Sequence, residues 1–230
     1  MKSILVTGGA GFIGNNLVRE LLKQNYKSII VVDDNTWGTA PELASMGVDV
    51  EICDIANLKI ISKLMKHCDS VVHLAASTNV TLSNKRPEKC IEDNVLGTFN
   101  LLKAASENHI EHFISASTGG ALMGDVDGGV NETMAPNPQS IYGASKLAAE
   151  GLCSAFAGSF DLPTLSLRFS NIYGEHSLHK TSAIAMLCKS IFEDKAFELY
   201  GDGKQVRDYL YVKDLAKIKW TDLQGGYASA

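Results

Sequence analysis

The sequence lacks the features of several specialised classes of protein. Its five cysteines are an odd number, and the closest two, Cys53 and Cys68, are fifteen positions apart. We therefore expect neither a disulfide framework nor a cysteine metal site, and no metal ion. Lysine and arginine total 21 against 26 acidic residues, without a basic block. This balance argues against nucleic acid and anionic membrane surfaces as partners.

Long apolar runs are also absent. No run reaches the roughly 18 consecutive apolar residues that a membrane-spanning helix needs. The first residues, Met1, Lys2 and Ser3, lead directly into a strand-like stretch rather than a signal peptide. We therefore expect a cytoplasmic protein without a membrane span. The hydrophobic fraction of 45% is that of an ordinary globular protein.

Short β-branched runs alternate with helix-like segments along the chain. The strand-like runs occupy residues 4–6, 29–32, 48–52, 71–74, 113–115 and 164–167. The segments between them place apolar residues at helical spacing, as at Leu17, Leu21 and Leu22. Repeated strand–helix–strand order predicts an α/β fold with a doubly wound parallel sheet, covered by helices on both faces.

A glycine-rich turn follows the first strand and opens the first helix. Residues 7–14 have the sequence TGGAGFIG. Such glycines let the backbone approach a pyrophosphate closely, and the start of a helix offers free N–H groups to it. Asp33 ends the second strand, nineteen residues after Gly14, where a carboxylate would accept hydrogen bonds from an adenosine ribose. The pattern predicts a Rossmann-type nucleotide site; plain turn glycines and a capping aspartate are the alternative.

Two adjacent acids at the end of the second strand narrow the choice of cofactor. Asp34 directly follows Asp33, and no arginine lies near them in the sequence. A 2′-phosphate would therefore meet two negative charges without a compensating cation. The predicted cofactor is NAD rather than NADP.

A tyrosine and a lysine lie four positions apart at the start of the helix-like stretch 140–157. This spacing places Tyr142 and Lys146 on one face of the helix. An ammonium beside the phenol, helped by the positive nicotinamide, would lower the tyrosine pKa from about 10 toward neutrality and make Tyr142 a general base. Thr118 ends the fifth strand and is the predicted hydroxyl partner; Ser117 is the alternative, and simple capping of the strand would explain either.

Together these motifs resemble those of the extended short-chain dehydrogenase/reductases, and within them the NAD-dependent nucleotide-sugar epimerase/dehydratase family. The resemblance runs from residue 1 to about residue 218. Its motifs are residues 8–14, 32–34, 54–55, 73–76, 94–98, 142–146, 167–174 and 200–209.

The resemblance implies contacts to the cofactor and the substrate. The implied cofactor residues are Gly8, Gly11, Phe12 and Ile13 at the pyrophosphate, Asp33, Asp34, Thr36 and Gly38 around the adenosine ribose, Asp54 and Ile55 at the adenine, Leu74, Ala75 and Ala76 along the dinucleotide, and Lys146 and Phe169 at the nicotinamide end. Asn171 and Arg207 would contact the nucleotide sugar, with Arg207 at the diphosphate oxygens.

Two glycines after Thr118 narrow the expected chemistry. Dehydratases and decarboxylases of the family place an acidic residue at this point, whereas this chain has Gly119 and Gly120. The resemblance therefore favours a UDP-hexose 4-epimerase that acts through a transient 4-keto sugar. A dehydratase, decarboxylase or reductase of the same family, or a non-catalytic NAD-binding relative, remains an alternative.

The length and the family resemblance also predict the organisation of the chain. Residues 1–165 are expected to form the NAD-binding domain, and residues 166–230 part of a substrate-binding domain. Residues 219–230 do not resemble the family's continuation, so this second domain is expected to be incomplete, a truncation. Small residues such as Ala144, Ala148 and Gly151 suit the helix contacts of a homodimer like that of the family. Packing within one subunit is the alternative.

Overall fold

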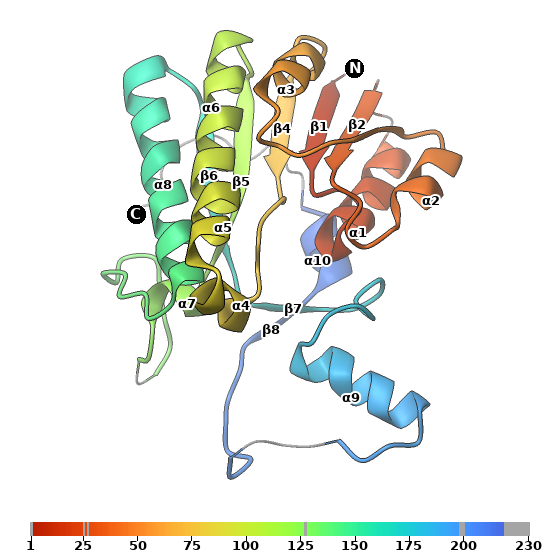
Figure 1. The fold of residues 1–230 in the computed structure, drawn as a ribbon, viewed down its shortest axis with the longest axis vertical. Coiled ribbons are helices and arrows are strands. Elements are labelled where there is room, and N and C mark those ends of the chain that lie inside the picture. Colours follow the sequence, from red (N-terminus) through yellow and green to blue (C-terminus); the bar gives the residue numbers. More distant parts are fainter. Residues whose placement is uncertain (1, 25, 27, 127, 198–200, 219–230) are drawn as a thin grey trace.

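The chain folds around one parallel six-stranded sheet (Figure 1). The computed structural model describes residues 2–24, 26, 28–126, 128–197 and 201–218; residue 200 of the last family motif and residues 219–230 of the expected second domain lie outside them. The strands are β1 (Ser3–Thr7), β2 (Ser28–Asp33), β3 (Asp49–Ile52), β4 (Ser70–His73), β5 (His112–Thr118) and β6 (Thr164–Phe169). Their order is β3-β2-β1-β4-β5-β6, and every neighbouring pair is parallel. The predicted doubly wound sheet is confirmed.

Helices cover both faces of this sheet. The elements outside the sheet are α1 (Phe12–Leu21), η1 (Leu22–Gln24), α2 (Ala40–Ser45), α3 (Leu58–Met65), α4 (Val80–Lys85), α5 (Pro87–Ile91), η2 (Glu92–Leu96, a π-helical turn), α6 (Gly97–Glu107), α7 (Gly120–Met123), α8 (Ile141–Phe160), β7 (Asn171–Tyr173), α9 (Ala183–Phe192), β8 (Tyr209–Tyr211) and α10 (Val212–Ala216). One apolar cluster joins the sheet to α3, α6 and α8, and a second joins it to α1, α2 and α10. Within β1, Leu5 faces the first cluster, whereas Ile4 and Val6 face the second.

The direction of the strand order reverses between β1 and β4. The two strands are neighbours in the sheet, but the chain leads from β1 outward through β2 and β3 before it returns to β4. In open α/β sheets a crevice forms at such a switch point, beyond the carboxyl ends of the strands. The loops after β1, β2 and β4 therefore meet at one edge, where the sequence motifs predict the cofactor site.

The segments after β6 lie largely beyond the carboxyl ends of the strands (Figure 1). β7 pairs with β8 in parallel, and α10 returns to the main body, where Leu215 packs in the same cluster as α1. β6 spans the expected domain boundary after residue 165. The division into domains 1–165 and 166–230 stays a prediction.

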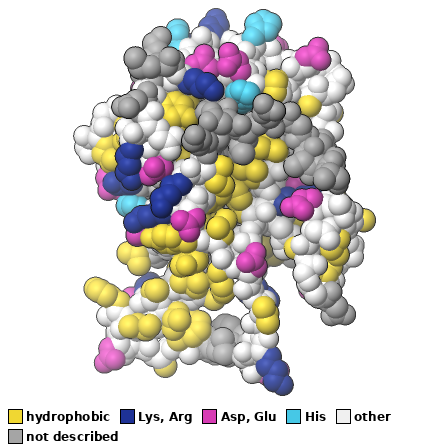
Figure 2. All heavy atoms as spheres, turned by 180° about the vertical axis from the view of Figure 1, so that it is seen from behind, with side chains coloured by type: hydrophobic (Ala, Val, Ile, Leu, Met, Phe, Trp, Pro, Cys, Tyr) yellow, Lys and Arg dark blue, Asp and Glu magenta, His cyan; other side chains and the backbone are white. Residues whose placement is uncertain are grey.

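Helix α9 stands apart from the two apolar clusters. Its side chains Met186, Leu187, Ile191 and Phe192 are exposed, and Figure 2 shows hydrophobic side chains gathered on this part of the surface. Ala185 is the buried residue of the helix.

In the part of the chain that the structure describes, no helix combines the length and the apolar character needed to cross a membrane. The cytoplasmic location stays a prediction. No group of three or more histidine, cysteine, aspartate or glutamate side chains suited to a metal ion occurs among the described residues.

Candidate active site

The glycine turn after β1 brings the start of α1 very close to the backbone. Gly8 has a φ of +69°, and a Cβ added there would lie 2.6 Å from the amide nitrogen of Ala75. A Cβ on Gly14 would lie 2.2 Å from the carbonyl oxygen of Gly8. Gly11 precedes α1 without a side-chain cap, so N–H groups of the first turn remain available to an anion. The turn is packed too closely for side chains at Gly8 and Gly14, and the free N–H groups at the start of α1 fit the predicted pyrophosphate.

The carboxylate of Asp33 holds this turn in place. One oxygen accepts a hydrogen bond from the amide of Ala10 at 2.9 Å, and the other accepts one from Asn35 at 2.8 Å. Burial raises the pKa of Asp33, and these two hydrogen bonds oppose the rise. A carboxylate offers about four acceptor positions, so room remains for the ribose hydroxyls predicted from the sequence. The hydrogen bond between the amide of Ala10 and Asp33 could not be predicted from the spacing of the motif.

The loop after β2 carries three of the expected adenosine contacts. Asp34 accepts hydrogen bonds from the amide and the hydroxyl of Thr36, at 2.9 and 2.6 Å. Gly38 follows with a φ of +72°, which glycine adopts without strain. All three residues therefore belong to one turn beside the glycine turn, consistent with their predicted role.

The residues expected at the adenine differ in exposure. Asp54 caps the following turn by accepting a hydrogen bond from the amide of Ala56 at 2.8 Å. Ile55 belongs to the apolar cluster beneath α6, and only 8% of its surface is exposed. A Cβ on Gly97 would lie 2.7 Å from the Ile55 side chain, so the helix start fits against it closely.

A buried histidine organises the end of β4, which precedes the expected dinucleotide contacts Leu74, Ala75 and Ala76. The ring nitrogens of His73 lie 2.7 Å from the hydroxyl of Thr7 and 3.0 Å from that of Thr98. Burial lowers the pKa of His73 to about 3, so the ring is neutral at pH 7. The Thr7 hydroxyl also accepts a hydrogen bond from the amide of Ala75 at 3.3 Å. The network ties the loop after β4 to β1 and α6.

The predicted tyrosine, threonine and lysine come together between β5 and α8. Tyr142 and Thr118 line one cavity, and the Thr118 hydroxyl is close enough to act on the pKa of the phenol. Lys146 is 5% exposed, and its ammonium donates to the carbonyl of Ala116 at 2.9 Å. Ser140 caps α8 by accepting a hydrogen bond from Gly143 at 3.1 Å, which fixes the first turn of the helix.

The pKa of Tyr142 differs from the sequence expectation. Burial raises it to about 12, and the Thr118 hydroxyl only partly opposes this rise. Burial also lowers the pKa of Lys146 to about 8. The expected shift toward neutrality is wrong for the protein chain by itself, because removal of the phenol from water outweighs the effect of Thr118, and Lys146 is not among the groups that lower the pKa.

A buried ion pair distinguishes the two hydroxyl candidates at the end of β5. Ser117 donates to Glu150 at 2.6 Å, and Arg168 pairs with the same carboxylate at 2.8 Å. Glu150 lies one helical turn after Lys146 on α8, a position that carried no motif in the sequence. Ser117 is thus engaged with Glu150, whereas Thr118 lies beside Tyr142 in the same cavity and acts on the pKa of its phenol. This geometry supports Thr118 over Ser117.

One cavity of about 430 Å³ collects residues from distant parts of the chain. The predicted residues that line it are Phe12, Ile13, Thr118, Tyr142, Phe169, Asn171 and Arg207. Four further residues line the cavity, and the sequence analysis gave none of them a role: Thr78 and Lys180, which lie outside the motifs, and Tyr173 and Tyr209, which lie within two of them. The arrangement can bind a polar ligand beside a phenol and a hydroxyl.

Comparisons with known proteins agree with this geometry. The family model described as "NAD dependent epimerase/dehydratase family" matches residues 4–228. A putative UDP-glucose 4-epimerase of Methanocaldococcus jannaschii is 37% identical over 221 residues, which are 93% of this chain and 71% of that protein. A dTDP-glucose 4,6-dehydratase of Neisseria meningitidis is 34% identical over 236 residues, 94% of this chain and 66% of that protein.

A solved structure is similar over nearly the whole chain. The UDP-glucose 4-epimerase of Thermus thermophilus, in complex with NAD, has a TM-score of 0.88 and 33% identity, and it covers 97% of this chain and 76% of its own. The chain belongs to the NAD-dependent epimerase/dehydratase family. The resemblance found in the motifs is confirmed, and so is NAD as the cofactor of the family.

Proposed function

We propose that this protein is an NAD-dependent 4-epimerase of UDP-hexoses. The observation that carries the proposal is the shared cavity, in which Tyr142 and Thr118 meet Phe169 and the sugar-nucleotide candidates Asn171 and Arg207. The relatives include UDP-glucose 4-epimerases, in agreement with a UDP-linked substrate. This cavity therefore holds both the groups that could move a proton and the groups that could contact a nucleotide sugar.

The cofactor would lie along the edge of the sheet, from the adenosine loop to the cavity. The glycine turn and the start of α1 would hold its pyrophosphate, Asp33 its ribose, and Phe169 would lie near its nicotinamide end. When bound there, NAD supplies a reversible hydride acceptor. The close packing of α1 on the glycine turn supports this assignment, because a Cβ at Gly14 would collide with the backbone of Gly8 and Gly9.

In the proposed reaction Tyr142 takes the proton of the sugar 4-hydroxyl. A phenol with a pKa of about 12 is a weak base at pH 7, so nearby positive charge is needed to favour the phenolate. Lys146 and an oxidised nicotinamide would supply that charge. Thr118 would hold the sugar oxygen through its hydroxyl while the 4-keto sugar turns over in the cavity. Once the opposite face of C4 is turned toward the cofactor and the hydride is returned there, Tyr142 would give the proton back to the 4-oxygen, so the reaction causes no net oxidation.

The lining of the cavity favours epimerisation over elimination. Dehydration needs a further acid or base beside the sugar, and no aspartate, glutamate or histidine is among the described residues that line the cavity. Gly119 and Gly120 stand directly after Thr118, where neither can supply a proton. A 4,6-dehydratase is the second candidate, because relatives with that activity are about as similar as the epimerases.

Incubation with UDP-sugars tests the proposed activity. The purified protein is expected to interconvert UDP-glucose and UDP-galactose, or their N-acetyl forms, without added reductant, because the hydride is removed and returned within one turnover. Proton NMR of the sugar distinguishes the two epimers. Formation of a 4-keto-6-deoxy sugar from a dTDP- or UDP-sugar would reject the epimerase in favour of the dehydratase. Bound NAD without any turnover would indicate a non-catalytic relative.

We also propose that the protein forms a homodimer through α6 and α8. On α8 the small residues Ala144, Ala148, Gly151 and Ala155 are exposed on one stripe, so they do not pack within the subunit. Phe99 of α6 is likewise 41% exposed. Light scattering is expected to give twice the mass of the chain; the mass of one chain would reject the dimer.

A further inference from the structure

The cavity around Tyr142 carries positive charge that the sequence motifs explain only in part. Two of its described lining residues are cations, Arg207 and Lys180, and none is a carboxylate. The family motifs include Arg207, whereas Lys180 stands between β7 and α9 and belongs to none of them. A polar cavity with cations and no acid suits an anionic ligand.

Lys180 has only a neutral partner at the edge of this cavity. Its ammonium donates to the hydroxyl of Thr78 at 3.3 Å, and no carboxylate among the described residues forms an ion pair with it. Burial lowers the pKa of Lys180 from its usual value. Removing an ammonium from water costs free energy unless an anion compensates it. The side chain is therefore placed where an anionic oxygen would stabilise it.

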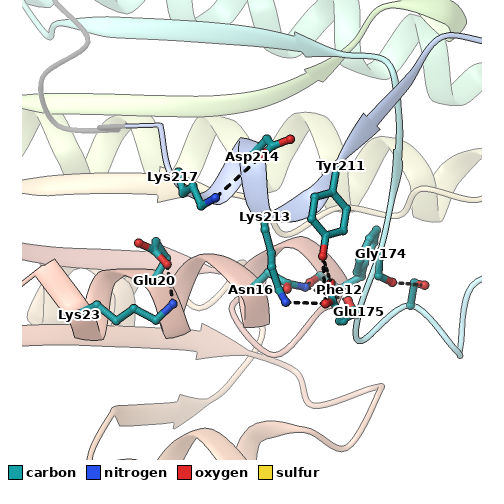
Figure 3. Close-up of polar contacts among 11 residues, drawn as sticks. Phe12, Asn16, Glu20, Lys23, Gly174, Glu175, Tyr211, Lys213, Asp214 and Lys217 are labelled. Carbon is teal, nitrogen blue, oxygen red and sulfur yellow. Dashed lines mark hydrogen bonds and ion pairs between the residues drawn. The ribbon is translucent and has the colours of Figure 1, made fainter.

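The backbone that carries Lys180 is tied to the rest of the site on its amino-terminal side. The carbonyl of Glu175 accepts a hydrogen bond from the side chain of Asn16 on α1 at 2.9 Å. Its carboxylate accepts hydrogen bonds from Tyr211 at 2.9 and 3.0 Å and also pairs with Lys213, as Figure 3 shows. These contacts join the segment to α1, β8 and α10.

Two further contacts lie next to Lys180 itself. Its amide donates to the carbonyl of Ser177 at 2.8 Å, which closes a tight turn. The neighbouring ring of His179 stacks on Trp37, with ring centroids 4.3 Å apart. Trp37 lies in the loop of the predicted adenosine contacts, so the segment bridges from that loop to the cavity. Lys180 is thereby held at the lining of the cavity by contacts on both sides of its segment.

We infer that Lys180 binds an anionic group of the substrate, either the diphosphate of the nucleotide sugar or a carboxylate on its sugar ring. The substrate class rests on the proposed function. Arg207 lines the same cavity, so the two cations would share the charge of the ligand. Thr78 would orient the ammonium, because its hydroxyl accepts one hydrogen bond from Lys180 and leaves two N–H donors for the ligand.

Isothermal titration calorimetry of ligands into the NAD-bound protein tests this inference. The variant Lys180→Gln is compared with wild type for UDP, UDP-glucose and UDP-glucuronic acid. Loss of one charged hydrogen bond predicts binding about tenfold to a hundredfold weaker. If the partner is the diphosphate, all three ligands lose affinity alike. If it is a sugar carboxylate, only UDP-glucuronic acid does.

The matched control is Lys189→Gln, which removes the same charge from the exposed surface of α9. It is expected to bind all three ligands as wild type does. Lys180→Met serves if the glutamine variant does not fold, because its apolar chain fills the same space without a buried polar group. Unchanged binding in a folded Lys180 variant overturns the inference, as does a wild-type protein that binds none of the three ligands. Binding without turnover would instead reject the epimerase and leave the inference standing.

Discussion

Replacing Tyr142 with phenylalanine is expected to lower the rate of epimerisation by about 10²- to 10⁴-fold, the usual contribution of a positioned acid–base group. Phenylalanine keeps the ring and removes the hydroxyl that lies beside Thr118 in the cavity. Retention of NAD is expected to be unchanged, because the glycine turn and Asp33 lie on other elements. Initial rates with UDP-galactose and the NAD content of the purified protein provide the two measurements.

A matched substitution separates loss of the hydroxyl at this site from a general effect of the change. Tyr26 precedes β2 and packs against the apolar cluster around α1, outside the lining of the cavity. Tyr26→Phe is expected to leave the rate within a few-fold of wild type. If Tyr142→Phe were as active as this control, Tyr142 would not be the base.

Replacing Gly14 with alanine is expected to abolish NAD retention and to destabilise the fold. The new Cβ would lie 2.2 Å from the carbonyl oxygen of Gly8 and 2.5 Å from the Cα of Gly9, so α1 must move away from the turn. Overpacking of this kind lowers the free energy of unfolding by about 1–3 kcal/mol. Denaturant unfolding and the NAD content after purification measure the two effects.

Gly158 on α8 provides the control for this glycine. A Cβ added there meets no atom within 4 Å. Gly158→Ala is therefore expected to keep NAD and to raise the free energy of unfolding by up to about 1 kcal/mol, because alanine favours the helix more than glycine does. Full NAD retention in Gly14→Ala would show that the close approach of α1 to the turn is not needed for the cofactor.

The central strands β1, β2 and β4 could be predicted from the sequence because nearly all of their residues are buried, on both faces of the sheet. A strand of this kind is a short continuous apolar run, and β2 with its sequence SIIVVD is an example. The glycine turn and the pair Tyr142 and Lys146 could be predicted for a similar reason, since each depends on local spacing. The pairing of β7 with β8 could not, because it joins segments 38 positions apart at Asn171 and Tyr209.

Contacts between distant residues account for what the sequence did not show in the site. The hydrogen bond from Ala10 to Asp33 and the ion pair of Glu150 with Arg168 form only when the sheet and the helices are assembled. The raised pKa of Tyr142 likewise comes from burial, which depends on the whole cavity. Lys180 has no motif around it, and only its position at the cavity identifies it.

A crystal structure of the protein with NAD and UDP would show directly whether the nicotinamide and the sugar nucleotide meet at Tyr142. We expect the pyrophosphate of NAD at the start of α1, the nicotinamide beside the phenol of Tyr142, and no other placement of the two groups. We also expect UDP in the cavity that Asn171 and Arg207 line. A nicotinamide bound away from this cavity, or a Tyr142 hydroxyl out of reach of any sugar beside the ring, would contradict the proposed reaction.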